Sequence, residues 1–372
     1  MARIVPVRGP AADVWQRVRE IRAAGDVPLV GDERWPDAQW TAVRALAREA
    51  TVPGRAGWAS LTSGSGGTPR VVVRTAESWR ASFPAVSALL RASAGDSVVL
   101  PAPPSSSLTL FSLAHAIDGA GPRPVFGGHT AGAAGAAGAV CFHGTPQGLR
   151  RLVESDEPTT VRTALVGGSH LEPDLRDAAR ARGIRVIGYY GAAELSFVAI
   201  DDGTGLRPFP GVEVDLRDGE LWVRSPFVAL GYLGRPGPLR VEGEWATVGD
   251  LAELADGALR IRGRADGAIL TASATVIPEE VEAWLRRQAG VRDAVVFGLP
   301  AAPVGELVAA MIEPRGAAAD VAALRRAAAA DLAPANRPRA WFSGELPRTA
   351  AGKPARAEVR RGVLAKEVSR LA

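Results

Sequence analysis

Short apolar runs that alternate with helical segments constrain the fold of this chain more than any other feature of its sequence. We expect strands at residues 97–101, 139–142, 163–166 and 184–187, and helical segments alternate with them. A single helix is expected at residues 76–92. Alternation of this kind is typical of a parallel sheet with crossover helices. We therefore predict an α/β fold whose large N-terminal domain has mostly parallel sheets and flanking helices.

The pattern changes after about Pro208. Short alternating strands separated by Gly and Asp turns then predict an antiparallel meander or a small β-barrel-like part. The expected strands are those at residues 212–216, 220–223 and 258–262. Further on, the expected elements are helices 279–288 and 318–332 and strands 294–297 and 306–313. They predict a compact α+β unit of about a hundred residues.

The length of 372 residues allows two or three domains. We predict an N-terminal domain at residues 1–263, a hinge at 264–267 and a small C-terminal domain at 268–372.

The composition of the chain bears on whether nucleic acids or membranes are expected as partners. Hydrophobic residues make up 47% of the chain, and 44 basic residues are nearly balanced by 40 acidic ones. We see no dense basic block with interleaved aromatics, so nucleic-acid binding is not expected. No uninterrupted apolar stretch is long enough to cross a bilayer. With Cys141 as the single cysteine, these features predict a soluble cytoplasmic protein without a membrane partner.

Only two of the basic residues are lysines, Lys353 and Lys366. A planar guanidinium replaces most surface lysines but cannot imitate a compact ammonium point charge. Lys353 is therefore a candidate catalytic residue. By itself the segment from Leu346 to Lys353 fits a surface lysine in a flexible C-terminal loop better than a catalytic residue, so other motifs must decide.

A Gly-rich segment between two expected strands is the first of these motifs. Its small residues would let backbone N–H groups curl round an anion, and Arg70 would add charge for a phosphate. A flexible hairpin connection is the alternative. The candidate residues of this segment are Thr62, Ser63, Gly64, Ser65, Gly66, Gly67, Thr68 and Arg70.

Two acidic residues stand where ligands commonly bind. The segment Tyr190-Gly191-Ala192-Ala193-Glu194 follows an expected parallel strand, and ligands bind at the carboxyl ends of such strands. Glu194 would suit Mg²⁺, although the start of a helix is an alternative. Asp250 would suit the hydroxyls of a ribose, although a simple turn Asp is an alternative.

The segment from Gly263 to Gly267 lies at the predicted domain boundary. Arg264 would contact a phosphate or a ribose, and Asp266 would serve as a hinge that absorbs a backbone rotation. A polar linker is the alternative.

Taken in order, these motifs resemble those of the adenylate-forming superfamily, which includes acyl-CoA synthetases, adenylation domains and luciferases. The resemblance runs from about Leu61 to Arg356, and the short N-terminal region is similar to compact members such as actinobacterial o-succinylbenzoate-CoA ligases. The matching segments are Thr62–Arg70, Tyr190–Glu194, Val248–Asp250, Gly263–Asp266, Pro278–Glu282 and Pro347–Lys353.

The resemblance implies a two-step enzyme in which residues 1–263 form the ATP- and acid-binding domain and residues 268–372 form a small mobile domain that carries the catalytic Lys353. A carboxylate attacks the α-phosphate of ATP, and a second nucleophile, usually the thiol of CoA, takes the acyl group. Lys353 would bridge the attacking carboxylate and the α-phosphate. Glu194 would hold Mg²⁺, Asp250 the ribose and Tyr190 the adenine. The remaining implied nucleotide-binding residues are the loop from Thr62 to Arg70, the adenine-pocket loop Gly167-Gly168-Ser169, and Gly191, Ala193 and Arg264.

Several positions depart from the family pattern. Gly66, Ala193 and Val248 replace threonines, which would slow the reaction without abolishing it. Ala272-Ser273 replaces the Gly-Gly pair that lets CoA pass close to the backbone. Ser105, Ser106 and Ser107 stand where the substrate pocket usually carries a bulky residue, which predicts an unusual pocket for the acid.

Three functions follow from these observations. The first is an acid–CoA ligase for a small carboxylic acid, with ATP and Mg²⁺. The second is an adenylate-forming enzyme with another nucleophile, namely an amine, a carrier-protein thiol or nitrite in diazo formation. The third is a non-catalytic nucleotide-binding relative, against which the retained Lys353 stands.

Overall fold

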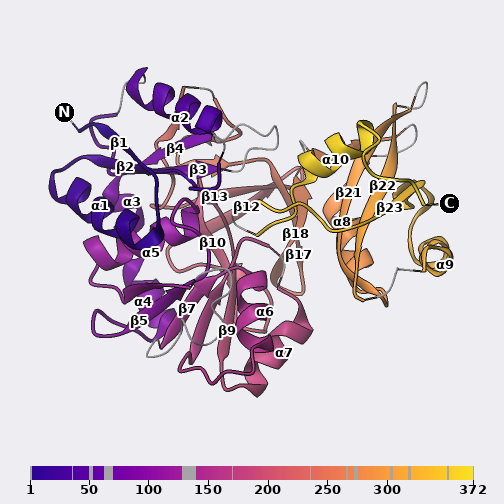
Figure 1. The fold of residues 1–372 in the computed structure, drawn as a ribbon, viewed down its shortest axis with the longest axis horizontal. Coiled ribbons are helices and arrows are strands. Elements are labelled where there is room, and N and C mark those ends of the chain that lie inside the picture. Colours follow the sequence, from indigo (N-terminus) through magenta and orange to yellow (C-terminus); the bar gives the residue numbers. More distant parts are fainter. Residues whose placement is uncertain are drawn as a thin grey trace.

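The computed structural model describes most of the chain and shows an α/β protein with a large N-terminal part and a small C-terminal part beside it (Figure 1). The predicted fold class is confirmed. The described residues are 2–35, 37–49, 53–62, 70–127, 140–169, 171–234, 236–264, 267–271, 275–301, 305–316, 320–349 and 352–371.

The parallel sheet expected from the alternating pattern is present, in the strand order β11-β10-β9-β8-β7-β5-β6. The pairs from β9 to β6 are parallel, whereas β10 and β11 run antiparallel at one edge. The strands are β5 (Ser97–Leu100), β6 (Arg123–Phe126), β7 (Cys141–Gly144), β8 (Thr163–Val166), β9 (Arg185–Ala192), β10 (Ser196–Asp201) and β11 (Arg207–Pro208). The carboxyl ends of the parallel strands therefore share one edge, as a ligand site of this fold class requires.

A second sheet in the N-terminal part has the strand order β1-β2-β3-β4-β14. Its members are β1 (Ile4–Val7), β2 (Val27–Val30), β3 (Trp58–Thr62), β4 (Arg70–Arg74) and β14 (Gly231–Leu233). The β14 strand comes from far along the chain and pairs antiparallel with β4, so that Tyr232 lies opposite Val72. This pairing brings Leu233 opposite Val71, the residue that follows Arg70 at the end of the predicted phosphate loop.

The single helix predicted at residues 76–92 is wrong, because two helices occupy the segment. These are α3 (Ala76–Arg80) and α4 (Phe83–Leu90), with Ser82 at the N-cap of α4. Pro84 has no N–H to continue the hydrogen bonds of α3, but a proline suits the first turn of a new helix. The other helices described before residue 200 are α1 (Ala11–Ala23), α2 (Asp37–Glu49), α5 (Ser107–Asp118), α6 (Pro146–Glu154) and α7 (Pro173–Ala181).

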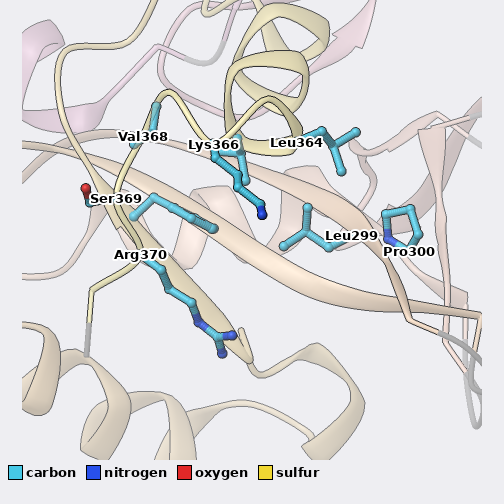
Figure 2. Close-up of a pocket in the computed structure, with 9 residues that line it drawn as sticks. Leu299, Pro300, Leu364, Lys366, Val368, Ser369 and Arg370 are labelled. Carbon is cyan, nitrogen blue, oxygen red and sulfur yellow. The ribbon is translucent and has the colours of Figure 1, made fainter.

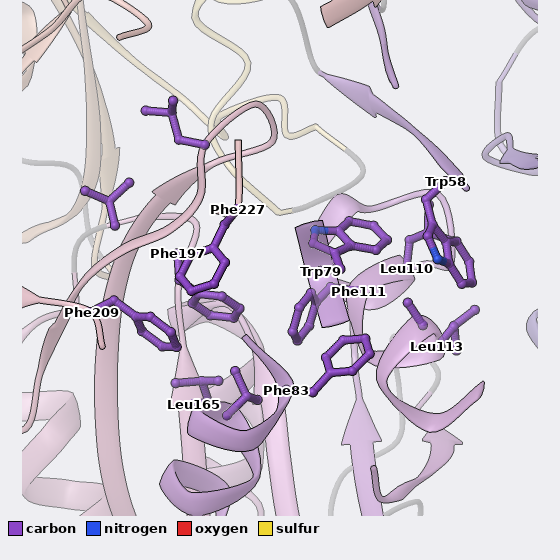
Figure 3. Close-up of a cluster of buried hydrophobic side chains, with 14 of the residues drawn as sticks. Trp58, Trp79, Phe83, Leu110, Phe111, Leu113, Leu165, Phe197, Phe209 and Phe227 are labelled. Atoms are coloured by element: carbon purple, nitrogen blue, oxygen red, sulfur yellow. The ribbon is translucent and has the colours of Figure 1, made fainter. Parts of the chain in front are cut away.

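An aromatic cluster forms the centre of the N-terminal core (Figure 3). Phe111 meets Trp79 edge-on, with ring centroids 5.6 Å apart, and Phe197 stacks on Phe209 at 5.0 Å. His115 is buried in this cluster, with its Nε2 atom 2.9 Å from Ser87 Oγ.

The meander predicted after Pro208 is a mostly antiparallel sheet with the order β15-β16-β13-β17-β18, and β12 pairs with β13. Its strands are β12 (Glu213–Arg217), β13 (Glu220–Arg224), β15 (Arg240–Glu242), β16 (Trp245–Thr247), β17 (Asp250–Ala255) and β18 (Ala258–Arg264).

The small C-terminal part is built on the sheet order β21-β22-β23, with one hydrophobic cluster around α8 and α9 and another around α10. Its elements are β19 (Ile269–Leu270), β20 (Thr275–Val276), α8 (Pro278–Arg286), β21 (Val291–Ala301), β22 (Gly305–Pro314), α9 (Val321–Asp331), a 3₁₀ turn (Pro334–Asn336), β23 (Ala340–Ser343) and α10 (Arg356–Leu364). The domain boundary at 264–267 stays a prediction. Among the described helices of the whole chain, none has the length and apolar character needed to cross a bilayer.

Candidate active site

Two of the predicted nucleotide-binding segments lie at the carboxyl ends of neighbouring parallel strands. Gly167–Ser169 follows β8, and Tyr190–Glu194 spans the end of β9 and the turn into β10. Glu194 thus lies in a tight turn between antiparallel strands and does not start a helix. A β-carbon on Gly191 would stand 2.1 Å from the carbonyl oxygen of Ser196, so this turn requires glycine.

Tyr190, Asp250 and Arg264 are brought together although sixty or more residues separate Tyr190 from the other two. The hydroxyl of Tyr190 donates a hydrogen bond to Asp250 Oδ2. Asp250 begins β17 and is the register partner of Arg264, the last residue of β18. The predicted adenine and ribose residues therefore form one group where two sheets meet.

Glu194 is 7% exposed and is held by neighbours from other elements. Tyr232 donates its hydroxyl hydrogen to Glu194 Oε1 at 2.7 Å, and the backbone carbonyl of Glu194 accepts the N–H of Ala229 at 2.7 Å. Burial, together with the bond to Glu194 and its negative charge, raises the pKa of Tyr232, while the charge of Arg70 acts in the opposite direction. The phenol therefore stays protonated and can donate.

A buried cation lies behind this turn. Arg74 donates to the backbone carbonyls of Ala193 and, at 2.9 Å, of Phe227, and its guanidinium lies 4.8 Å from the ring of Trp79. Complete burial lowers the pKa of Arg74 to about 9, and the negative charge of Glu194 works against this shift. Arg74 thus fixes the backbone of the turn that carries Glu194.

The residues around Glu194 fit a magnesium ion that is shared with a nucleotide. Within the described ranges, no group of three His, Cys, Asp or Glu side chains is placed to hold a metal ion. Mg²⁺ commonly binds one or two carboxylates and completes its shell with water and substrate phosphates. A single buried carboxylate is compatible with that mode.

Lys353 lies on a tight turn that backbone hydrogen bonds define. Thr349 N–H donates to the carbonyl of Lys353 at 2.7 Å, and Gly352 N–H donates to the carbonyl of Thr349 at 2.8 Å. Gly352 has a φ of +79°, which favours glycine. Arg348 anchors the turn to the C-terminal core through Asp293 at 3.0 Å and Glu313 at 2.8 Å.

This turn contacts the N-terminal part at the predicted adenine loop. The Cε atom of Lys353 lies 3.5 Å from the position that a β-carbon on Gly168 would take. A β-carbon on Gly352 would stand 2.3 Å from Gln147 Oε1 and 3.8 Å from Thr145 Oγ1, at the start of α6. The side chain of Lys353 is exposed, but it lies against the candidate site.

The predicted acid-pocket serines follow β5, at the same edge of the sheet. Ser105 is buried and donates to Asp32 Oδ2 at 3.4 Å, while Ser106 is the N-cap residue of α5 and Ser107 begins the helix. Burial acts to raise the pKa of Asp32, but hydrogen bonds from Arg34 outweigh it and lower the pKa overall. Ser105 is thus tied to the scaffold.

Several predicted residues lie outside the part of the chain that the structure describes. Arg70 lies opposite Thr62 in the register of β3 and β4, so both ends of the phosphate loop are placed. The undescribed candidates are Ser63, Gly64, Ser65, Gly66, Gly67, Thr68, Asp266 and the pair Ala272-Ser273.

Sequence reasoning missed Tyr232, Arg74 and Gln147. Tyr232 is one of only three tyrosines and stands in the Gly- and Pro-rich segment 231–238, which was a usable signal. Arg74 and Gln147 carry no local signal, because their importance comes from contacts with residues far along the chain.

The other lysine lies elsewhere. Lys366 lines a surface hollow on the C-terminal part, together with apolar side chains that include Leu299 and Leu364 (Figure 2). None of the candidate nucleotide-binding residues that the structure describes lines this hollow. The two lysines therefore serve different surfaces.

With this fold and this site in place, family membership can be stated. The family described as AMP-binding enzyme matches residues 27–233, and the AMP-binding enzyme C-terminal domain matches residues 280–353. The chain belongs to the AMP-binding enzyme family.

Curated relatives and solved structures agree with this assignment. A 2-succinylbenzoate–CoA ligase of Salmonella typhimurium is 30% identical over 276 residues, which cover 70% of this chain and 59% of that protein. A similar ligase of Geobacillus kaustophilus is 33% identical over 57% of this chain and 49% of its own length. The chain thus spans about half to three fifths of these relatives.

The solved structures show the same fold. A variant of Escherichia coli MenE with bound OSB-AMS superposes with a TM-score of 0.81 at 22% identity, over 97% of this chain and 88% of that one. The amide bond synthetase McbA from Marinactinospora thermotolerans superposes with a TM-score of 0.74 at 24% identity, over 97% of this chain and 90% of that one.

Proposed function

We propose that this protein is an AMP-forming acid–CoA ligase. It activates a small carboxylic acid with ATP, releases pyrophosphate and transfers the acyl group from the adenylate to CoA. The observation that carries the proposal is the position of Lys353, whose Cε lies against Gly168 in the loop predicted to border adenine. Lys353 is one of only two lysines in the chain, so its presence beside this loop supports a specific role for it.

The first step joins the acid to the nucleotide. A carboxylate oxygen of the acid attacks the α-phosphorus, and the bond from that phosphorus to the bridging oxygen breaks, so that pyrophosphate leaves. The ammonium of Lys353 lies between the attacking carboxylate and the α-phosphate and stabilises the charge that develops on them. Lys353 has to be a point charge here, because a planar fork does not fit between two reacting groups.

The other residues bind and orient the nucleotide. Asp250 accepts the ribose hydroxyls, Tyr190 flanks the adenine, and Arg70 pairs with phosphate at the end of its loop. Glu194 would hold Mg²⁺, which shields phosphate charge when it is bound. Because Tyr190 and Asp250 are already hydrogen-bonded to each other, their arrangement is set before the nucleotide arrives.

In the second step the thiol of CoA loses its proton to solvent and its sulfur attacks the acyl carbon, and AMP leaves as the acyl–oxygen bond breaks. Lys353 has to withdraw for this step, and the rotation is assigned to residues 264–267. The relatives named 2-succinylbenzoate–CoA ligases support CoA as the acceptor and make an aromatic acid of that type the first substrate to test. Cytoplasmic location stays a prediction.

The test is an assay of pyrophosphate release. The protein is incubated with ATP, Mg²⁺ and a panel of acids that includes 2-succinylbenzoate, benzoates, short-chain acids and nitrite, with and without CoA. We expect acid-dependent release that CoA accelerates, together with formation of an acyl-CoA detected by mass spectrometry.

The other functions give different results in the same assay. Acid-dependent pyrophosphate release that CoA never accelerates would replace CoA by an amine, a carrier thiol or nitrite. Nucleotide binding without release for any acid would contradict the enzymatic proposal. Lys353→Ala serves as the inactive control.

A further inference from the structure

Tyr232 is the direct side-chain neighbour of Glu194 and comes from a different part of the chain. Its strand, β14, lies beside β4, which leaves the predicted phosphate loop. The phenol uses both of its hydrogen-bonding capacities, since it donates to Glu194 Oε1 at 2.7 Å and accepts the N–H of Leu239 at 3.1 Å. The hydroxyl is therefore fixed in position and direction.

The ring of Tyr232 is fixed as well. A β-carbon on Gly237 would stand 2.1 Å from the ring carbon that bears the hydroxyl, so the chain folds back tightly over the tyrosine. Gly237 has no side chain to prevent this approach. Strand pairing on one side and the 237–239 backbone on the other thus hold the phenol against the carboxylate.

We propose that Tyr232 is a positioning residue for magnesium binding: by binding Oε1 of Glu194, it orients the buried carboxylate so that Oε2 faces the metal and the nucleotide phosphates. This inference rests on the proposed role of Glu194. The chemistry is that of an outer partner that fixes a metal ligand, and the loss of such a partner weakens metal affinity by about 10- to 100-fold.

The opposite role, competition, would have a different geometry. A tyrosine that blocks the metal would have to release Glu194 whenever Mg²⁺ binds. The bond from Leu239, the β14–β4 pairing and the close approach of Gly237 all oppose such a release. The two roles also predict opposite changes in the Mg²⁺-dependent affinity for ATP when the hydroxyl of Tyr232 is removed, so a single variant distinguishes them.

The experiment compares ATP binding with and without metal. Isothermal titration calorimetry measures the dissociation constant of ATP for the full chain, once in EDTA and once in excess Mg²⁺. The constant in EDTA divided by the constant in Mg²⁺ gives a ratio that reports how much the metal contributes to ATP binding. For Tyr232→Phe we expect this ratio to fall about tenfold, while the affinity for ATP in EDTA stays within about twofold, which is less than 0.5 kcal/mol.

Three further variants make the result specific. Gly237→Ala pushes on the ring without removing the hydroxyl and should lower the ratio in the same direction. Tyr189→Phe removes a phenol that binds His143 and should leave the ratio unchanged. Glu194→Gln should lower the ratio, and adding Tyr232→Phe to it should cause no further loss.

Each outcome supports or overturns the proposal. A ratio for Tyr232→Phe that equals or exceeds that of the wild type, with Glu194→Gln reduced, overturns the role of Tyr232 and leaves that of Glu194 intact. If the ATP affinity of the wild type does not depend on Mg²⁺, or if Glu194→Gln keeps the wild-type ratio, the proposed roles of both Tyr232 and Glu194 are overturned. If Tyr232→Phe does not fold, as judged by its melting curve, Gly237→Ala decides in its place.

Discussion

The two parts of the molecule hold their predicted reactive groups in different ways. In the N-terminal part, Glu194 is nearly buried and bonded to Tyr232, and Asp250 is bonded to Tyr190. In the C-terminal part, Lys353 is an exposed side chain on a turn that backbone hydrogen bonds and the ion pairs of Arg348 maintain. The N-terminal part thus holds its carboxylates in place by hydrogen bonds, whereas the C-terminal part carries one exposed ammonium group.

In the proposed function, this difference separates nucleotide binding from the chemical step. Groups bonded to one another within a core keep their geometry whether or not a ligand is bound, which favours nucleotide binding. The distance from Lys353 to those groups depends on how the small part meets Gly168 and the start of α6. A charge delivered in this way can be present for one step and absent for the next.

The largest effect is expected for Lys353→Ala. Removal of a group that acts on developing charge costs about 10²–10³ in kcat, whereas the N-terminal binding groups stay in place. Acid-dependent pyrophosphate release should fall by at least that factor, and the calorimetric ATP affinity should hardly change. Wild-type rates in this variant would refute the assigned role and remove the contrast between the two parts.

Asp250→Ala should show the reverse pattern. Loss of a hydrogen bond to a charged group costs about 1.5–3 kcal/mol, and the expected place for this loss is nucleotide binding. The KM for ATP should rise by about 10- to 100-fold with a smaller change in kcat. An equal loss in kcat with an unchanged KM would place Asp250 in the chemical step and contradict the division.

A smaller effect is expected at the contact between the parts. In Gly352→Ala the methyl group would meet Gln147 Oε1 and strain a residue with a φ of +79°. We expect pyrophosphate release to fall roughly three- to tenfold, which corresponds to about 0.6–1.4 kcal/mol.

Gly290→Ala is the matched control for this variant. Gly290 has a φ of +80° in the same part of the chain, and no heavy atom stands within 4 Å of the position of its β-carbon. The Gly290→Ala variant therefore has the same backbone strain as Gly352→Ala but no new contact with the N-terminal part. Equal losses of activity in the two variants would show that strain, not docking, explains the result.

The last effect concerns stability against acid and not activity. Burial lowers the pKa of His143 to about 3, with help from the charge of His115, and that of His115 to about 4, against an ordinary value of 6.5. Between these values the unfolded chain binds more protons, so stability falls as the pH drops. The two together should lower the free energy of unfolding by about 2 kcal/mol between pH 6.5 and 5.5.

This loss should be confined to the N-terminal part, because all four histidines precede residue 171. Hydrogen exchange at the two pH values, corrected for the intrinsic rates, should show loss of protection in β7 and α5 but not in β21 and β22. His115→Gln should reduce the acid sensitivity by about half. Equal losses in both parts, or an unchanged sensitivity in the variant, would contradict the assignment to these histidines.

The local pattern was enough for the architecture and for the position of Glu194 along it. Alternating strands and helices predicted the parallel sheet, and the placement of Glu194 after a strand predicted its edge of the sheet. Pro84 is a signal for the start of a new helix at α4. The break between α3 and α4 was nevertheless missed, because the apolar pattern on both sides suits a continuous helix. Strand β14 was missed because three residues carry too little pattern to be recognised.

By itself, the sequence determined the order of the elements and the chemical identity of the groups, including the single lysine in the Pro347–Lys353 motif. Only the tertiary structure decided which groups meet: Tyr232 with Glu194, Tyr190 with Asp250, and Lys353 with Gly168. The physical reason is that periodicity and turn chemistry act over a few residues, whereas a hydrogen bond between residues 38 or 60 positions apart depends on how sheets pair and cores pack.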